Sequence, residues 1–267
     1  MDMFSLENKI IVLTGATGLL GRQFAKTLID NGATVILADI NYQAALQQSK
    51  ELGNNSIPYN LDITDKENLI ELKEFLMDKF GRIDVLINNA AINDMVENPI
   101  NKLEESKFEN YPVELFRKVL DVNVTGIFLT CQVVGKEMAK QKNGNIINIA
   151  STYGIVAPNQ NIYKDKLGYQ TFYKSCAYPT SKAAVIQLTR FLAAYWGNCN
   201  VRVNCLSPGG VENNQDETFI NNYSNLTPLN RMAHPTDYNG AIVFLASDSS
   251  KYMTGANLVV DGGWTIW

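Results

Sequence analysis

Three residues near the middle of the sequence, Ser151, Tyr178 and Lys182, have side chains that together can transfer a proton. Ser151 follows an apolar, β-branched run at residues 145–150, which is typical of a buried parallel strand. From Tyr178 onward the apolar residues recur at helical spacing, so Tyr178 and Lys182, four residues apart, share one helix face. A serine at the end of a strand, facing a tyrosine backed by a lysine, is a candidate acid–base site.

The first forty residues carry a pattern that is typical of dinucleotide binding. An apolar strand at residues 9–14 runs into the loop GATGLLG at residues 15–21, a helix follows, and a second strand at residues 34–38 ends on Asp39. Such glycines let the backbone approach a pyrophosphate at the helix N-terminus, and the acid accepts hydrogen bonds from the adenosine ribose. If the glycines only made a tight turn, the position of Asp39 would be a coincidence.

Asp39 also bears on which dinucleotide binds. Its carboxylate would repel the 2′-phosphate of NADP. No Arg or Lys lies within residues 15–21 or next to Asp39 to hold that phosphate. The sequence therefore predicts NAD rather than NADP as the cofactor.

Strands and helices continue to alternate through the first third of the chain. Helices are expected at residues 42–52 and 66–80, and strands at residues 57–61 and 83–87. This alternation predicts parallel crossover units, in which ligands lie beyond the carboxyl ends of the strands. Four polar residues fall at such strand ends, where ordinary turn chemistry would also place Asp and Asn: Asp39, Asp62, Asn89 and Ser151.

A long helix is predicted at residues 112–140, after a polar loop at residues 93–110. It places Asn123 among apolar neighbours, where the amide either makes a structural hydrogen bond or marks a backbone bulge or a bound water. The remaining expected elements are a strand at 201–206 that runs into Ser207-Pro208-Gly209-Gly210, a loop and short helix at 211–223, a helix at 236–247 and a strand at 257–260.

These elements predict a single α/β domain over residues 1–267: a doubly wound Rossmann fold with about seven parallel strands and helices on both faces. Residues 1–110 are expected mainly to bind the dinucleotide. Residues 111–267 are expected to hold the catalytic and substrate-binding groups.

Composition and charge exclude several classes of protein. With 46% hydrophobic and 19% charged residues, the 267-residue chain can bury a large core. A net charge of −4 argues against nucleic acid or a membrane surface as partner, and no apolar run approaches the roughly 20 residues of a membrane span. Residues 1–9 do not resemble a signal peptide. The four cysteines lack the spacing of metal ligands, and His234 stands alone in a loop. The sequence therefore predicts a cytoplasmic protein with free thiols and no metal site.

With these residues placed, the chain resembles the short-chain dehydrogenase/reductase family over nearly its whole length. The matching motifs are TGATGLLG at 14–21, Asp62, NNAA at 88–91, Asn123, Ser151, YPTSK at 178–182, SPGG at 207–210 and the closing VDGG. The sequence departs from the family pattern in its glycine spacing, which is that of extended members that epimerise or dehydrate nucleotide sugars. It also has NNAA where the family usually has NNAG, and the residues around Asn213 differ from the usual pattern. The gap between Ser151 and Tyr178 is longer than usual.

A narrower resemblance covers mostly the second half. The stretches IINIASTYGIVAP, NIYKD and SPGGVENNQDETFINNY resemble the oxidoreductases found with flagellin and surface-glycan modification, in pathways toward legionaminic-acid-type sugars. This resemblance implies a sugar derivative as the substrate.

The family resemblance also implies roles for individual residues. Tyr178 would be the acid/base, Lys182 would also bind the nicotinamide ribose, Ser151 would hydrogen-bond the reacting oxygen, and Asn123 would hold a proton-relay water. The implied cofactor contacts are Gly15, Thr17, Gly18, Leu19, Leu20, Gly21, Asp39, Asp62, Ile63, Asn89, Ala90, Ala91, Tyr178, Lys182, Pro208, Gly209 and Val211. The implied substrate contacts are Ser151, Tyr153, Asn93 and Gly210.

A tyrosine needs help to act as a base, because its free pKa of about 10 keeps it mostly protonated at pH 7. Lowering that pKa by about three units takes roughly 4 kcal/mol of differential stabilisation. Lys182, one helical turn away, and the positive nicotinamide are expected to supply that charge together. Tyr178 is the only tyrosine of the chain with a lysine four residues later.

The main hypothesis is an NAD-dependent oxidoreductase acting on a sugar or sugar phosphate. The first alternative is a 3-oxoacyl carrier-protein reductase, which prefers NADPH and a basic docking surface. The second is an epimerase or dehydratase, which usually has a larger C-terminal region, and the third is a non-catalytic dinucleotide-sensing protein.

Two expectations concern surfaces. By resemblance, the protein is expected to be a homo-oligomer, tetramer or dimer, packed through the helices that hold Asn123 and Tyr178, with an apolar tail at residues 264–267. Residues 159–175, together with Tyr153, are expected to form a wall of the substrate pocket, because their tyrosines and asparagines suit hydroxyl-rich ligands.

Overall fold

The computed structural model describes residues 3–94 and 103–267 and contains a seven-stranded sheet in the order β3-β2-β1-β4-β5-β6-β7. Every pair of neighbouring strands is parallel. The strands are β1 (Ile10–Thr14), β2 (Thr34–Asp39), β3 (Ser56–Asn60), β4 (Val85–Asn88), β5 (Gly144–Ile149), β6 (Val201–Pro208) and β7 (Asn257–Val260). The strand order reverses between β1 and β4, which is where doubly wound sheets bind their ligands. The predicted fold class is confirmed.

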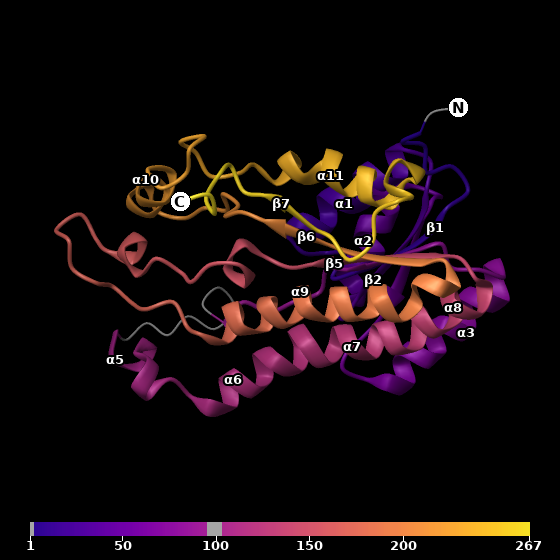
Figure 1. Cartoon of the computed structure of the whole chain (residues 1–267), viewed down its shortest axis with the longest axis horizontal. Coiled ribbons are helices and arrows are strands. Elements are labelled where there is room, and N and C mark those ends of the chain that lie inside the picture. The colour runs from indigo at the N-terminus through magenta and orange to yellow at the C-terminus, as the bar shows by residue number, and fades with distance from the viewer. Residues whose placement is uncertain (1–2, 95–102) are drawn as a thin grey trace.

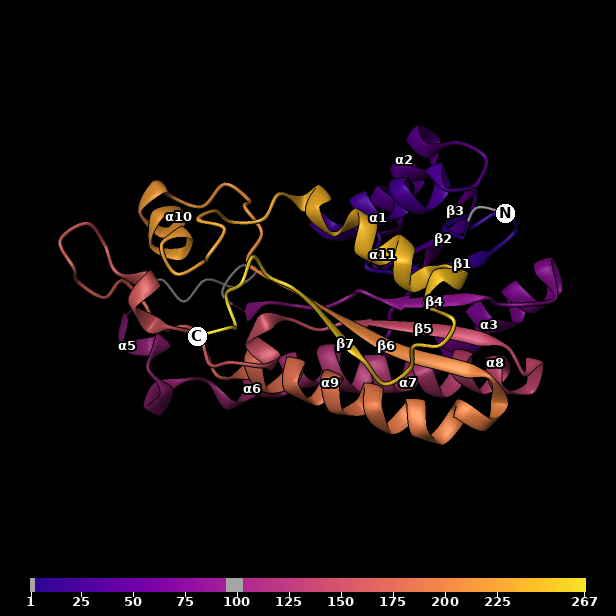
Figure 2. The ribbon, with the colours of Figure 1, turned by 45° about the horizontal axis from the view of Figure 1, so that its top comes forward.

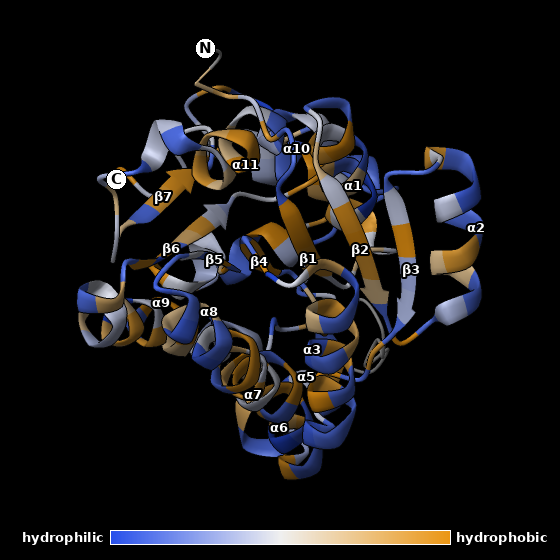
Figure 3. Cartoon of the chain, turned by 90° about the vertical axis from the view of Figure 1, so that its right-hand side faces the viewer, coloured by the Kyte–Doolittle hydropathy of each residue, from blue (hydrophilic) through white to orange (hydrophobic). Residues whose placement is uncertain are grey.

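Helices cover both faces of the sheet (Figures 1 and 3). The helices are α1 (Leu19–Asp30), α2 (Tyr42–Leu52), α3 (Lys66–Phe80), α5 (Leu103–Ser106), α6 (Val113–Leu120), α7 (Ile127–Thr130), α8 (Lys136–Gln141), α9 (Ala177–Trp196), α10 (Glu217–Ser224) and α11 (Asn239–Ala246). Helices α1 and α11 contribute to one core, and α3, α7, α8 and α9 to the other.

The strand β1 shows why the sequence builds two cores. All five of its residues are buried. Successive side chains of a strand point to opposite faces, and accordingly Ile10 and Val12 lie in the core with α9, whereas Ile11 and Leu13 lie in the core with α1. A continuous apolar run is therefore what a strand covered on both faces requires.

Most element ends follow local chemistry that can be read in the sequence. Asp65 accepts hydrogen bonds from the backbone N–H groups of Glu67 and Asn68 and so caps α3, and the helix stops at Gly81, whose φ is 69°. The predicted bounds of α2, α3 and β7 match the structure. Strands β3 and β4 are displaced by one or two residues from the predicted ranges, because strand ends lack such caps.

The helix predicted at 112–140 runs from α6 through α7 to α8, but two wider π-helical segments interrupt it, at Asp121–Gly126 and Cys131–Gly135. The first contains Asn123, so a backbone bulge does lie at this residue. By length and composition the stretch Val113–Gln141 could cross a membrane. Its side chains at Cys131, Val134 and Met138 are instead packed in the core.

Three predicted stretches differ from the structure. Residues 236–247 begin as a 3₁₀ turn, Pro235–Tyr238, before α11, because His234 and Asp237 form a capping box there. The polar loop at 93–110 contains the helix α5 and a 3₁₀ turn at Phe108–Asn110, and its residues 95–102 lie outside the described residues. Strand β6 is two residues longer than expected and includes Ser207 and Pro208.

A line of buried amides joins α9 to the sheet. Asn88 Nδ2 donates to Asn148 Oδ1 at 2.8 Å, and Asn148 Nδ2 donates to Thr189 Oγ1 at 2.9 Å. These bonds connect β4, β5 and α9, and among these amide groups Asn88 Oδ1 alone is buried without a partner in the described part of the chain. The helix that carries Tyr178 and Lys182 is thereby held in register with the strand that precedes Ser151.

Candidate active site

The glycine loop brings the backbone of β1 very close to that of β4. A Cβ atom added to Gly15 would lie 2.7 Å from Ala90 Cα, and one added to Gly21 would lie 2.2 Å from the carbonyl oxygen of Gly15. Thr14 Oγ1 accepts the backbone N–H groups of Asn89 and Ala90 at 3.0 and 3.1 Å. Only glycine fits these approaches, so the loop is held against the end of β4.

The N-terminus of α1 has the features of an anion site. Gly18 stands at its N-cap position, and no side chain of the described part of the chain caps it. The first N–H groups of the helix therefore remain available, next to backbone that no Cβ covers, and they carry the positive end of the helix dipole. A dinucleotide pyrophosphate fits this donor set. The adjoining residues named by the resemblance, Thr17, Leu19 and Leu20, lie on the same loop and first turn.

Asp39 lies at the end of β2 and is 8% exposed. Its Oδ2 accepts from both the backbone N–H and the hydroxyl of Thr17 at 2.9 Å, and its Oδ1 accepts from the backbone N–H of Asn41 at 2.9 Å. The carboxylate thus ties the glycine loop to β2. The structure adds Arg22, whose Nε donates to the carbonyl oxygen of Thr17 at 2.9 Å. The sequence argument missed this cation because it follows the loop by one residue.

Asp62 and Ile63 follow β3. Asp62 Oδ1 accepts from the backbone N–H and hydroxyl of Thr64 at 2.8 and 2.7 Å, which is the turn chemistry that the sequence left open as the alternative. Ile63 is buried against the π-helical segment: a Cβ added to Gly126 would lie 2.7 Å from Ile63 Cδ1. Both residues therefore have structural roles at the end of β3.

Asn123 is fully buried, and both the oxygen and the nitrogen of its side-chain amide make hydrogen bonds. Its Oδ1 accepts from the backbone N–H of Ile92 at 2.8 Å, and its Nδ2 donates to the Ile92 carbonyl oxygen at 3.0 Å and to Ser181 Oγ at 3.0 Å. The amide thereby fastens the segment after β4, which includes Ala91, to α9. Both sequence interpretations hold for this residue, a structural hydrogen bond and a bulged backbone.

Ser151, Tyr178 and Lys182 meet at the carboxyl end of β5. Lys182 is 2% exposed, its Nζ donates to the carbonyl oxygen of Ile149 at 2.7 Å, and it lies 5.6 Å from the centroid of the Tyr178 ring. Burial lowers the pKa of Lys182 to about 8, so it stays mainly protonated at pH 7. Ser151 is buried, and its Oγ accepts from the backbone N–H of Tyr153 at 3.1 Å.

The expected lowering of the Tyr178 pKa does not come from the chain alone. Burial raises the pKa of Tyr178 to about 12, and a hydrogen bond with Ser151 opposes the rise. Lys182 does not reverse this, since its ammonium is directed at the Ile149 carbonyl. At pH 7 Tyr178 is therefore a protonated donor, ready to give a proton to a carbonyl oxygen.

The residues after β6 form another side of the same edge. The backbone N–H of Gly210 donates to Tyr223 Oη at 2.6 Å, and the Tyr238 hydroxyl donates to the carbonyl oxygen of Gly209 at 3.1 Å. Val211 pairs with Ala233 in an isolated bridge. Pro208 ends the strand, so the SPGG motif is held between two tyrosines.

The segment between β5 and α9 extends away from the sheet beside α10 (Figure 2). Its 3₁₀ turn at Gln160–Tyr163 places the Tyr163 ring 4.7 Å from Phe172 and 5.5 Å from Phe219. The Tyr153 and Tyr163 hydroxyls are 3.4 Å apart. Tyr163 belongs to the same buried aromatic cluster as Tyr223 and Trp264. Ile162, Tyr163 and Phe172 of the segment thus pack with α10 and Trp264, whereas Leu167 and Tyr169 are exposed.

The end of this segment returns to Tyr178. Lys174 is 6% exposed, its Nζ lies 5.2 Å from the centroid of the Tyr178 ring, and it donates to Asn93 Oδ1. Sequence reasoning missed Lys174, although its position four residues before Tyr178 mirrors that of Lys182 four residues after it. Asn93 lies at the site, but as a partner of this lysine.

In the described ranges 3–94 and 103–267, no cluster of three or more His, Cys, Asp or Glu side chains is arranged to hold a metal ion. His234 caps the turn before α11 and lies 2.8 Å from Thr236 Oγ1. Its role is structural.

Comparisons with known proteins find relatives that match nearly the whole chain. Residues 15–265 match a family model described as enoyl-(acyl carrier protein) reductase. The post-translational flagellin modification protein A of Campylobacter coli is 35% identical over 98% of this chain and all of that protein. The 3-oxoacyl-[acyl-carrier-protein] reductase FabG of Thermotoga maritima is 33% identical over 98% of this chain and 99% of that protein.

Solved structures share the fold. A short-chain dehydrogenase of Leptospira borgpetersenii with bound NAD+ superimposes with a TM-score of 0.83, at 31% identity over 98% of this chain and 94% of that chain. A gluconate 5-dehydrogenase of Burkholderia cenocepacia in complex with NADP and tartrate gives a TM-score of 0.86 at 25% identity, over 100% of this chain and 98% of that chain.

Proposed function

The chain belongs to the short-chain dehydrogenase/reductase family, a family of oxidoreductases with nicotinamide cofactors, and from that premise we propose a specific reaction. The protein transfers a hydride between NAD and the hydroxyl or carbonyl carbon of a sugar or sugar phosphate, in surface-glycan biosynthesis. The observation that carries the reaction type is the meeting of Ser151, Tyr178 and Lys182 at the edge of the sheet where the glycine loop lies.

The chain's own residues handle the proton. The Tyr178 hydroxyl donates its proton to the substrate oxygen during reduction, and Ser151 donates a hydrogen bond to the same oxygen. The Lys182 ammonium, held by the Ile149 carbonyl, lies where it can stabilise negative charge that develops on Tyr178. Bound nicotinamide supplies or accepts the hydride, and its positive oxidised form favours loss of the Tyr178 proton in the direction of oxidation. Asn123 keeps the segment at Ile92 and the start of α9 in place.

The remaining cofactor contacts are proposed from their positions. The loop from Gly15 to Gly21 binds the pyrophosphate, Asp39 the adenosine ribose, and the ends of β3, β4 and β6 the rest of the dinucleotide. In this division residues 1–110 mainly bind the cofactor and residues 111–267 hold the catalytic and substrate groups of one domain.

Exchange of Asp39 tests the preference for NAD. In the Asp39→Ser variant, loss of the carboxylate removes repulsion of a 2′-phosphate, and the guanidinium of Arg22, held nearby at the Thr17 carbonyl oxygen, can attract it. We expect the ratio of kcat/KM for NAD to that for NADP to fall at least about tenfold. Steady-state kinetics with both cofactors measure this ratio, and Asp30→Ser, at an exposed position on α1, is the control. An unchanged ratio in Asp39→Ser would contradict the assignment of Asp39 to the ribose.

The sugar substrate rests on the flagellin modification relative and on the polar end of segment 159–175, where Lys174 lies beside the Tyr178 ring. The test is a screen for NAD reduction across free sugars, sugar phosphates and nucleotide sugars, with Tyr178→Phe as the blank. Turnover confined to acyl thioesters in a parallel NADPH assay would replace this proposal by a second candidate, the acyl carrier-protein reductase.

That second candidate is favoured by one observation, the likeness to FabG and to the reductase family model. Against it stand Asp39, which opposes the 2′-phosphate of NADPH, and the net charge of −4, which does not favour an acidic carrier protein. A non-catalytic dinucleotide-binding protein is a weaker candidate still, because Ser151, Tyr178 and Lys182 are all present and together.

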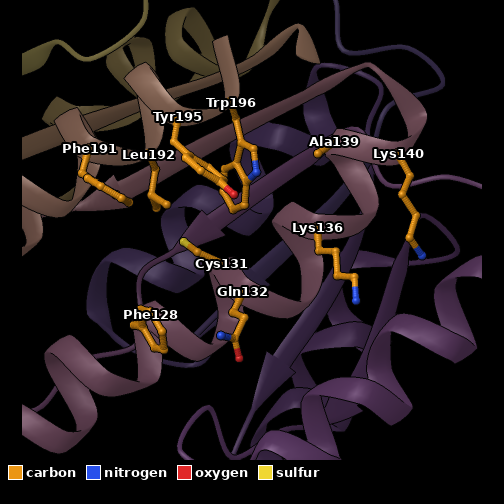
Figure 4. Close-up of a pocket in the computed structure, with 10 residues that line it drawn as sticks. All are labelled: Phe128, Cys131, Gln132, Lys136, Ala139, Lys140, Phe191, Leu192, Tyr195 and Trp196. Carbon is orange, nitrogen blue, oxygen red and sulfur yellow. The ribbon is translucent and has the colours of Figure 1, made fainter. Parts of the chain in front are cut away.

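We also propose that the protein is a homo-oligomer that packs through α7 and α9. A groove lies between α9 and the stretch from Phe128 in α7 to Lys140 in α8, as Figure 4 shows, and its large apolar side chains Phe128, Phe191 and Tyr195 are 46%, 60% and 65% exposed. The Phe191 and Tyr195 rings are stacked, with centroids 5.9 Å apart. Large apolar side chains gathered on one face indicate a protein interface, and a second copy of the chain is the occupant that the helices favour.

The oligomer is tested by placing charge in this groove. Phe191→Asp combined with Tyr195→Asp should shift the wild-type assembly to a species near the 29.7 kDa of one chain, because carboxylates would have to be buried at the interface. Size-exclusion chromatography with light scattering measures the mass. Tyr252→Asp, at a fully exposed position on another surface, is the control. A monomeric wild type would refute the proposal.

The proposed location is the cytoplasm. All four cysteines are free thiols, and Cys131 and Cys205 are buried, which is the usual state of cysteines in a reducing compartment.

A further inference from the structure

A polar cluster that no proposed step uses lies beside Tyr178. It consists of Asn93, Asp94, Lys174 and Ser175, and we call it the Lys174–Asp94 cluster. Asp94 is 1%, Ser175 4% and Lys174 6% exposed. Three such side chains are rarely buried together without a reason, because removing polar groups from water costs free energy unless partners replace the water.

Lys174 is held in place by its own segment. The side chain of Gln160 accepts from the backbone N–H of Lys174 at 2.8 Å and donates to its carbonyl oxygen at 3.0 Å. Gln170 Nε2 in turn donates to the carbonyl oxygens of Gln160 and Phe172. These bonds fix the main chain of Lys174, so its ammonium is directed to Asn93 and the Tyr178 ring rather than to solvent.

The ammonium of Lys174 has fewer partners than it can use. It offers three donors, and among the described residues only Asn93 Oδ1 accepts from it. No carboxylate of those residues lies within ion-pair distance of it, although Asp94 attracts it from farther away. Burial lowers the pKa of Lys174 to about 8, which leaves it mainly charged at pH 7. A buried cation in this state requires further acceptors.

Among the described residues, Asp94 has too few hydrogen-bond donors, whereas Lys174 has too few acceptors. Its Oδ2 accepts from the Tyr111 hydroxyl at 2.9 Å, but its Oδ1 is buried and has no partner in the described part of the chain. The hydroxyl of the adjoining Ser175 is also buried and lies close to the Tyr111 hydroxyl. A buried acceptor left without a donor costs about 1–3 kcal/mol, more for a charged group. A ligand that donates to Asp94 would remove that cost.

The charges of the cluster decide what kind of group fits it. An anion would satisfy Lys174 but would be repelled by Asp94, and a cation would do the reverse. A neutral hydroxyl satisfies both, since its oxygen accepts from the ammonium and its hydrogen is donated to the carboxylate. Lys174 Nζ lies 5.2 Å from the centroid of the Tyr178 ring, so a hydroxyl bound by this ammonium would lie close to the side chain that transfers the proton.

We propose that Lys174 and Asp94 are specificity-determining residues that bind the hydroxyl on the carbon adjacent to the reacting carbon, Lys174 donating and Asp94 accepting. The inference rests on the proposed function and narrows it: the substrate is a vicinal diol in oxidation and an α-hydroxy ketone in reduction. Ser175 Oγ lies in the same cluster and provides a further polar contact for that hydroxyl.

The test compares two ketones that differ by one hydroxyl, acetoin and butanone, as substrates for reduction by NADH. Both are smaller than a sugar, so neither is excluded by size. The wild type should prefer acetoin in kcat/KM by about a hundredfold or more, since a site built to bond a hydroxyl discriminates strongly against its absence. Lys174→Met and Asp94→Asn should each reduce the acetoin-to-butanone ratio to below about tenfold.

The ratio separates specificity from general catalysis. A lysine that acted only on Tyr178 would change both rates equally and leave the ratio as it was. Lys166→Met, at an exposed lysine of the same segment, should retain the wild-type ratio. Asp94→Asn keeps the side-chain shape and decides the test if Lys174→Met folds poorly, and the dissociation constant for NADH, by fluorescence, reports folding of each variant.

The outcomes distinguish the two proposals. A wild type that reduces both ketones at similar kcat/KM, or variants that keep its preference for acetoin, would overturn the role of the Lys174–Asp94 cluster and leave the proposed function standing. A wild type that reduces neither ketone, and no sugar in the screen, would overturn the proposed function and this inference with it.

Discussion

The variant Tyr178→Phe is expected to lose turnover by at least about a hundredfold to ten-thousandfold, the range that a positioned acid–base group contributes, while NADH binds nearly as before. The substitution removes one oxygen atom and keeps the ring between Lys174 and Lys182. Because the pKa of Tyr178 is raised to about 12, its hydroxyl is the proton reservoir for reduction at neutral pH. Water cannot replace it with the same geometry.

The measurement combines single-turnover kinetics with fluorescence titration of NADH. Tyr252→Phe, at a fully exposed tyrosine on another surface, is the matched control and should keep wild-type turnover. Unchanged turnover in Tyr178→Phe would remove the assignment of the acid–base role. A large loss of NADH binding would instead mean that the hydroxyl is needed to bind the cofactor, so that the loss of turnover could not be assigned to proton transfer alone.

The variant Gly21→Ala is expected to destabilise the fold by about 1–3 kcal/mol and to weaken dinucleotide binding, because a Cβ there would meet the Gly15 carbonyl oxygen at 2.2 Å and Ala16 at 2.9 Å. Both contacts are with backbone, which cannot rotate away as a side chain does. The loop must therefore shift, and with it the free N–H groups at the start of α1.

The control is another glycine in a helix. A Cβ added to Gly240 in α11 meets nothing within 4 Å, so Gly240→Ala should gain up to about 1 kcal/mol from helix propensity alone. Urea unfolding followed by circular dichroism gives the free energy of unfolding of both variants. If Gly21→Ala were as stable as the wild type and bound NADH equally well, close approach of the loop backbone would not be required.

Much of the fold follows from local sequence because its signals are local. Alternating apolar segments predict parallel crossovers, and a capping residue such as Asp65 or a positive-φ glycine such as Gly81 sets where a helix ends. The two-face burial of β1 likewise follows from its unbroken apolar run. These features depend on residues within a few positions of one another.

The parts that sequence reasoning missed depend on the tertiary structure. Lys174 and Asp94 are 80 residues apart and meet only because the segment before α9 folds back to the end of β4. The pKa of Tyr178 likewise depends on burial, which outweighs the nearby lysine and cannot be judged from spacing. Arg22 lies one residue beyond the motif, yet its side chain turns back to Thr17.

The hydrogen bonds of Gln160 and Gln170 have an evolutionary consequence. These bonds lie within the segment between Ser151 and Tyr178 and hold its two halves together. The ends of the segment join β5 and α9. The buried amides Asn88 and Asn148 hold those two elements through bonds outside the segment. Loop-closure entropy rises only slowly with length, so such an insertion can lengthen or change with little cost to the sheet. If this segment binds the substrate as proposed, substrate preference can change through it while the hydride-transfer framework stays the same.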